Sequence, residues 1–149
     1  KHAAEKHEAR RLETVKILGT DIDIECLEGA ERAVYATTAL GDTPPALRER
    51  YFPQIAGLHT MLPEVKRLAS FESNDLLAYE PPVTDVHLIL CRNVIIYFER
   101  EAQDKLFAAF HRVLAPGGFL VLGKVETLLG DARSLFSPVS ARERIFRKI

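Results

Sequence analysis

The chain has 149 residues, which is the length of a single domain. It is 47% hydrophobic and 28% charged, and its formal net charge is -1 at pH 7, so it has no excess of positive charge for nucleic acid or anionic membrane. No apolar run approaches the roughly 18 residues of a membrane helix, and no secretory signal pattern is present. The two cysteines, Cys26 and Cys91, form no metal-binding pair, so we expect free thiols, no metal site and a cytoplasmic protein.

The first half of the chain predicts short strands and helices in alternation. Residues 1–13 are rich in helix-forming residues but begin without a cap, so we expect the second half of a helix that has been cut. Residues 15–20, VKILGT, predict a strand, and residues 24–32 predict a helix. Residues 44–52, PPALRERYF, predict a short helix that begins with proline.

The middle of the chain gives a weaker pattern. We expect a loop or short turn at residues 34–43 and short strands at residues 58–62 and 66–71. Prolines and a glycine interrupt this part of the sequence, and they favour turns over long regular elements.

The second half shows stronger periodicity. The apolar run at residues 86–90 is typical of a strand buried on both faces of a parallel sheet. Residues 99–114 have the apolar spacing of an amphipathic helix. A turn at Gly117-Gly118, a buried strand at residues 119–122 and a last short strand at residues 144–147, RIFR, complete the chain. Strands that alternate with helices favour an open, mostly parallel α/β sheet.

Polar residues follow the predicted strands, where open α/β sheets bind their ligands. Asp21 follows the strand VKILGT, Asp75 precedes the next strand, and Arg92 and Asn93 interrupt the apolar stretch LILCRNVIIYF. One carboxylate can accept both hydroxyls of a ribose, which makes Asp21 a candidate cofactor ligand. The alternative is that Asp21 caps the following helix, a role for which Asp23 competes.

Several common catalytic motifs are missing from the sequence. It has no glycine-rich loop between a strand and a helix, no GxSxG, no HExxH and no Walker sequence. Its five histidines share no spacing pattern, so we expect them to be surface or structural residues.

At CRNVIIYF the chain resembles the CheR family, the S-adenosylmethionine-dependent methyltransferases that esterify glutamate side chains on chemotaxis receptors. Further matching segments follow in family order: TDID, ERAVY, PPALRERYF, NDLL and LAPGGFLVLGKVE. The ending, LFSPVSARERIFRKI, is similar to the variant found where an esterase and a methyltransferase are fused to sensor domains.

The resemblance implies a Rossmann-like class I methyltransferase sheet over residues 1–149, mostly parallel with an antiparallel edge strand. It also implies a small inserted β-subdomain at residues 51–71. We therefore expect VKILGT, VHLILC and FLVLG to be neighbours in the interior of one sheet, with RIFR antiparallel near its edge.

By position in the family motifs, the resemblance implies a role for each candidate residue. Asp21 would bind the ribose of S-adenosylmethionine, and Asp75 and Leu76 would lie against the adenine. Arg92 and Asn93 would line the cofactor near its methionine part.

The resemblance also implies that Tyr97 stands near the sulfonium and faces the incoming carboxylate, so Tyr97 and Arg92 are the expected catalytic residues. S-adenosylhomocysteine would be the product, and no metal is expected. From the residues alone, Tyr97 could instead pack beside Phe98, and Arg92 could form an ion pair with a nearby acidic residue.

The sequence departs from the family pattern in two respects. The family's glycine-rich cofactor loop and its N-terminal helical domain are not in these 149 residues, so we expect a part of a longer chain that alone binds the cofactor weakly or not at all. The family's Gly-His-Ser-Glu is Gly123-Lys124-Val125-Glu126 here, with only the glycine and the glutamate kept.

The leading hypothesis is the catalytic part of a glutamate O-methyltransferase that acts on the cytoplasmic helices of chemoreceptors or on a similar signalling protein. It predicts no nucleic-acid partner and no membrane span. Two alternatives remain at this point. The fold could serve as a non-catalytic regulatory or protein-interaction domain, or the enzyme could methylate a small-molecule carboxylate.

Overall fold

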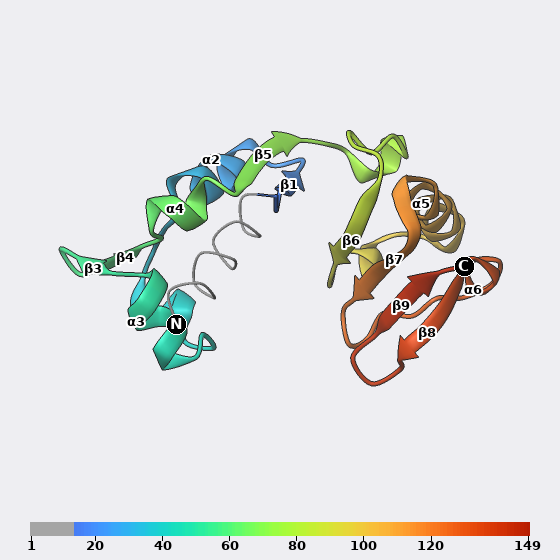
Figure 1. Ribbon diagram of the computed structural model, residues 1–149. Coiled ribbons are helices and arrows are strands. Elements are labelled where there is room, and N and C mark those ends of the chain that lie inside the picture. The colour runs from blue at the N-terminus through green and yellow to red at the C-terminus, as the bar shows by residue number, and fades with distance from the viewer. Residues whose placement is uncertain (1–13) are drawn as a thin grey trace. The chain divides into compact units, whose positions relative to one another are not determined.

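The computed structural model describes residues 14–149, and the helix predicted at residues 1–13 lies outside them. The chain divides into two compact units, one that ends at Asn74 and one that runs from Asp75 to Ile149 (Figure 1). Every helix within residues 14–149 is too short or too polar to cross a bilayer.

A pair of parallel strands forms the centre of the N-terminal unit. Strand β1 (Ile17–Asp21) pairs with β5 (Ala69–Ser73), with Ile17 opposite Ala69. Helix α2 (Ile24–Arg32), which has the predicted bounds, packs against both strands. Its N-terminus is capped by Asp23, whose side chain accepts hydrogen bonds from the backbone N–H groups of the first helical turn.

A small antiparallel sheet completes this unit. Its strand order is β2 (Val34–Tyr35), β4 (Leu58–Thr60) and β3 (Gln54–Ile55). The buried ring of His59 holds it to the preceding segment, because His59 Nδ1 lies 3.0 Å from the carbonyl oxygen of Phe52. The predicted strand at residues 58–62 is thus confirmed as β4.

Short helices connect these strands. The helix predicted at residues 44–52 is confirmed as α3 (Pro45–Tyr51), and the 3-10 helix η1 (Thr37–Leu40) lies in the region predicted as a loop. The strand predicted at residues 66–71 begins later, at Ala69, because Pro63 starts the short helix α4 (Pro63–Lys66) instead.

The C-terminal unit contains a four-stranded mixed sheet in the order β6-β7-β9-β8. Strands β6 (Val86–Cys91) and β7 (Leu114–Leu122) are parallel, with Cys91 opposite Leu122. Strand β9 (Ile145–Lys148) runs antiparallel to β7 and to the edge strand β8 (Phe136–Ser140). The mixed α/β class and the antiparallel strand RIFR next to the edge are confirmed.

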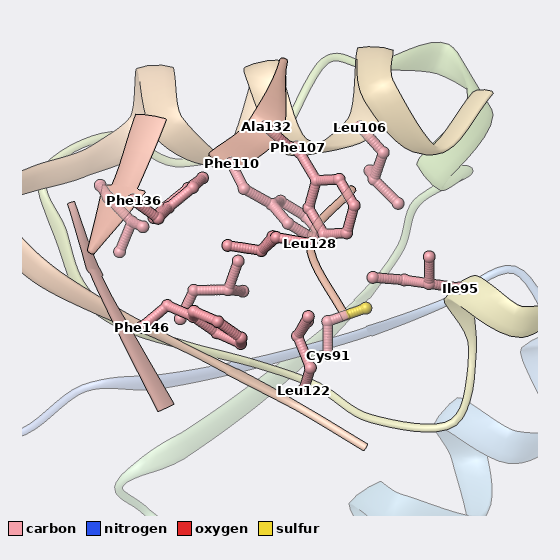
Figure 2. Packing of buried hydrophobic residues seen from close by; sticks show 12 residues of the cluster. Cys91, Ile95, Leu106, Phe107, Phe110, Leu122, Leu128, Ala132, Phe136 and Phe146 are labelled. Atoms are coloured by element: carbon pink, nitrogen blue, oxygen red, sulfur yellow. The ribbon is translucent and has the colours of Figure 1, made fainter. Parts of the chain in front are cut away.

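The hydrophobic core of this unit lies between the sheet and helix α5 (Arg100–Val113) (Figure 2). The apolar side of α5 buries leucine, phenylalanine and valine side chains, as its predicted periodicity requires. Cys91 and Leu122 contribute from the strands, and the short helix α6 (Ala132–Leu135) adds Ala132.

VHLILC and FLVLG are neighbours in one sheet, as predicted, because β6 and β7 pair in the four-stranded sheet of the C-terminal unit. VKILGT forms β1, which pairs with β5 within the N-terminal unit, and its predicted place beside VHLILC stays a prediction. Apolar runs indicate which segments form strands, but they carry no information on which strands pair.

The apolar run of β6 predicted burial on both faces, but within the C-terminal unit its side chains are packed on one face only. Leu88 and Leu90 are 51% and 67% exposed, whereas Ile89 and Cys91 turn toward the core. The reason is the alternation of side chains along a strand, together with a core that packs on one face of this sheet.

The predicted turn at Gly117-Gly118 is instead a bulge. Strand β7 already begins at Leu114, opposite Val86, and its register then shifts so that Leu88 lies opposite Phe119. Gly117 has φ +73°, a left-handed conformation that glycine adopts without steric cost.

Candidate functional site

Residues 92–97, which we call the 92–97 loop, follow the carboxyl end of β6 and carry both polar and apolar side chains. Arg92 and Asn93 are both exposed at its start. Tyr97 ends the 3-10 helix η3 (Ile95–Tyr97) and is 80% exposed. Three of the predicted site residues thus lie on one short segment at the carboxyl end of a strand, where open α/β folds bind their ligands.

The structural alternatives for Arg92 and Tyr97 find no support in the described part of the chain. The ion pairs formed among residues 14–149 do not include Arg92. The Tyr97 ring does not pack within the C-terminal unit, whereas Phe98 beside it packs against the core of that unit. The roles predicted for Arg92 and Tyr97 stay predictions.

The back of the 92–97 loop is held by a buried carboxylate, Glu126, which is only 3% exposed. Its Oε1 accepts hydrogen bonds from the backbone N–H of Val94 at 2.9 Å and of Ile95 at 2.8 Å. Its Oε2 accepts from the N–H of Asn93 at 2.9 Å and of Gly123 at 2.6 Å. One side chain thus joins the ends of the neighbouring strands β6 and β7.

These four hydrogen bonds decide the charge of Glu126. Burial alone would raise the pKa of this carboxyl, because removal from water disfavours the charged form. The N–H groups of Asn93, Gly123, Ile95 and Val94 outweigh that effect and hold the pKa below its ordinary value. Glu126 is therefore ionised at neutral pH and carries a negative charge inside the protein.

Gly123 leaves the space that this arrangement needs. A Cβ built at Gly123 would lie 2.7 Å from Glu126 Oε2 and 2.8 Å from the backbone nitrogen of Asn93, and it would also clash with Asn93 Oδ1. The backbone nitrogen cannot move away as a flexible side chain can. Glycine is thus required at this position for the loop to approach β7.

Cys91, at the end of β6, belongs to the core and not to the chemistry of the loop. Burial, with a smaller contribution from the charge of Glu126, raises the pKa of the Cys91 thiol to about 12. A thiol with that pKa carries almost no thiolate at neutral pH, so it is a poor nucleophile. Both cysteines are free, as expected.

Asp75 and Leu76 lie at the start of the C-terminal unit. Asp75 Oδ1 accepts a hydrogen bond from the N–H of Leu77 at 2.8 Å and caps the 3-10 helix η2 (Leu76–Ala78). Leu76 is half-buried and packs against the hydrophobic core. The structure gives both residues a local structural role, and their predicted contact with adenine stays a prediction.

Asp21 ends strand β1 in the N-terminal unit. Its Oδ1 accepts a hydrogen bond from the N–H of Asp23 at 3.0 Å, and its backbone oxygen accepts one from the N–H of Asn74. Asp23, not Asp21, caps α2, so the capping alternative for Asp21 is wrong. The exposed carboxylate of Asp21 is the kind of acceptor that ribose hydroxyls need.

Glu126 and Gly123 were not predicted as site residues from the sequence. The signal that could have identified them is the family's Gly-His-Ser-Glu segment, in which this chain keeps only these two residues. Within residues 14–149, no group of three or more histidine, cysteine, aspartate or glutamate side chains could hold a metal ion.

Comparison with known proteins gives a family match over most of the chain. Residues 2–145 match the family described as "CheR methyltransferase, SAM binding domain". The chain is 36% identical over 141 residues to an "Uncharacterized 104.1 kDa protein in hypE 3'region" of Rhodobacter capsulatus, covering 95% of this chain and 15% of that protein. It is 37% identical over 121 residues to the "Chemotaxis protein methyltransferase" of Vibrio parahaemolyticus, covering 80% of this chain and 44% of that one.

Among solved structures, the N-methyltransferase NodS from Bradyrhizobium japonicum, in complex with S-adenosyl-L-homocysteine, superposes with a TM-score of 0.45 at 16% identity. The match covers 97% of this chain and 87% of NodS. At that TM-score the likeness is too distant to bear on individual residues. The chain spans less than half the length of the two curated relatives described above.

Proposed function

The chain belongs to the CheR methyltransferase family, whose cofactor is S-adenosylmethionine, and on that premise we propose that it is the cofactor-binding part of a protein-glutamate O-methyltransferase. The proposed substrates are glutamate side chains on the cytoplasmic helices of chemoreceptors or of similar signalling proteins. We propose this activity for a longer protein that contains the chain, called the parent protein below, because the chain spans less than half the length of the curated relatives. The observation that carries the proposal is the exposed 92–97 loop at the carboxyl end of β6, in a chain that matches this family from residue 2 to residue 145.

The donor set on the chain fits an adenosyl cofactor. Asp21 offers an exposed carboxylate at the carboxyl end of a parallel strand, where it would accept hydrogen bonds from ribose hydroxyls. Asp75 and Leu76 would lie against the adenine, and Arg92 and Asn93 would border the methionine part. Each of these assignments is a proposal that rests on the family motifs, supported by the exposure of every side chain among them except that of the half-buried Leu76.

The proposed reaction requires little acid–base catalysis from the protein. S-adenosylmethionine, when bound, supplies an electrophilic methyl group. A glutamate carboxylate with a pKa of about 4.3 is already ionised at neutral pH, so no general base is needed. The chain's contribution would be to orient the carboxylate and exclude water from it, and the exposed Tyr97 is placed on the loop that would do so.

A methyl-transfer assay tests this proposal. The longer parent protein is incubated with methyl-tritiated S-adenosylmethionine and the purified cytoplasmic domain of a chemoreceptor from the same genome. A glutamate methyl ester releases its label as volatile methanol in base, whereas methyl groups on nitrogen or carbon stay attached.

We expect label on the receptor that base releases as methanol. A receptor variant with glutamine at its methylation sites serves as the control and should remain unlabelled. Base-stable label, or label on small molecules alone, would contradict the proposed substrate. Failure of the parent protein to bind the cofactor would favour a non-catalytic role for the fold.

A further inference from the structure

The backbone at the start of the 92–97 loop has a conformation that concentrates N–H groups on one side. Asn93 has φ +61°, a left-handed value that is uncommon outside glycine, and Val94 follows in the right-handed region with φ -117° and ψ -42°. Residues of opposite hand in succession turn neighbouring N–H groups toward one concave, anion-binding hollow. The N–H groups of Asn93, Val94 and Ile95 converge in this way.

Glu126 supplies the anion for that hollow from within the protein. It follows β7, and its two carboxylate oxygens accept hydrogen bonds from the three N–H groups that face the hollow and from that of Gly123. The turn that carries it is closed by a hydrogen bond from the N–H of Glu126 to the carbonyl oxygen of Gly123 at 3.0 Å. The anion is therefore held in a closed turn that directly follows the core strand β7.

The hydrogen bonds to this carboxylate stabilise the conformation of the loop. Without the carboxylate, the three N–H groups would be left without their acceptor, and the left-handed conformation of Asn93 would no longer be compensated. The loop would then relax toward conformations that turn these N–H groups to water. Arg92 and Tyr97 would move with it, since both lie on the same six-residue segment.

Glu126 is not itself in a position to touch a ligand, because its carboxylate is buried behind the loop. The exposed side of the loop carries Arg92, Asn93 and Tyr97, the residues proposed above for the cofactor and the methyl group. The buried carboxylate thus lies on one side of the loop and the side chains proposed for the ligand on the other. We propose that Glu126 is a positioning residue that fixes the 92–97 loop for cofactor binding. This inference rests on the proposed function. Gly123 takes part by leaving room for the carboxylate.

A rescue experiment in the parent protein tests the positioning role, with S-adenosylhomocysteine affinity measured by calorimetry at neutral pH. Glu126→Ala empties the hollow, and we expect the affinity to fall roughly tenfold to a hundredfold, the scale of a small misplacement in a site. Formate has two carboxylate oxygens and can occupy the emptied hollow. We expect it to restore the affinity of Glu126→Ala in a saturable manner, whereas chloride at the same ionic strength does not.

Two further variants complete the design. Glu126→Gln should lose affinity without rescue by formate, because its side chain still fills the hollow while its amide N–H₂ opposes two of the four N–H donors. Glu143→Gln removes an exposed glutamate from the same unit and should bind as the wild type does.

The outcomes separate this inference from the proposed function. Wild-type affinity in folded Glu126→Ala or folded Glu126→Gln would overturn the positioning role. If formate raises the melting temperature of Glu126→Ala without restoring its affinity for S-adenosylhomocysteine, the role of Glu126 is purely structural. If Glu126→Ala does not fold, the affinity of Glu126→Gln decides. A wild-type protein that binds no S-adenosylhomocysteine would instead refute the proposed function, and the inference with it.

Discussion

Replacement of Gly123 by alanine should damage the contact between the two strand ends. The added Cβ would lie 2.8 Å from the backbone nitrogen of Asn93 and 2.7 Å from Glu126 Oε2, distances that real Cβ atoms do not show. We expect the loop and the carboxylate to separate and to lose two of their four hydrogen bonds. Hydrogen bonds to charged groups contribute about 1.5–3 kcal/mol each. Alanine also lowers the conformational entropy of the unfolded chain, which would offset about 0.4–1 kcal/mol of this destabilisation.

The net loss of unfolding free energy should therefore be about 2–5 kcal/mol. Urea unfolding followed by circular dichroism measures it. Gly29→Ala is the matched control, because a Cβ there meets only the end of the Arg32 side chain at 3.7 Å, and alanine within α2 should stabilise by about 0.5–1 kcal/mol. An unfolding free energy of Gly123→Ala equal to that of the wild type would refute the packing described for this loop.

Four further predictions concern single side chains. In the parent protein, Asp21→Asn should weaken S-adenosylhomocysteine binding without a change in melting temperature. Asp23→Ala should lower the free energy of unfolding by about 1 kcal/mol, because a helix cap is lost, and should leave the affinity intact. The reverse pattern would exclude Asp21 as a ribose ligand. Arg92→Ala should weaken cofactor binding in a normally folded protein, and a large drop in melting temperature with unchanged affinity would instead indicate a structural ion pair. Tyr97→Phe should lower kcat more than it lowers cofactor affinity, as expected of a contact made mainly in the transition state; wild-type turnover would leave only the ring with a role. Because the folded pKa of Glu126 is lowered, its stabilising contribution should be complete above the unfolded pKa of about 4.3 and be lost as the pH falls through the folded pKa. The urea-unfolding free energies of the wild type and Glu126→Gln should therefore converge on acidification, and a difference that does not change with pH would contradict this.

Elements with a strong local pattern were predicted well from the sequence. Helix α2 has the predicted bounds, and α5 and β6 each agree to within a residue at either end. Their apolar periodicity and their caps act over a few neighbouring residues, which a single sequence displays directly. The end of β6 at Cys91 is likewise indicated by the two polar residues that follow, Arg92 and Asn93.

Several features that depend on distant residues were not predicted from the sequence. The pairing of β1 with β5 and the register of the bulged strand β7 against β6 both join distant segments, and neither leaves a local pattern. Glu126 was missed because its role depends on donors that lie 31 to 33 residues away in the sequence. A lone glutamate after a strand otherwise suggests a solvated surface residue.

The most direct measurement of the central claim is a crystal structure of the parent protein with S-adenosylhomocysteine bound. The account predicts that the ligand contacts the exposed side of the 92–97 loop, with Glu126 still buried behind that loop and bonded to its N–H groups. A ligand bound away from Arg92 and Asn93, with the 92–97 loop facing only solvent, would contradict the assignment of this loop to the cofactor site.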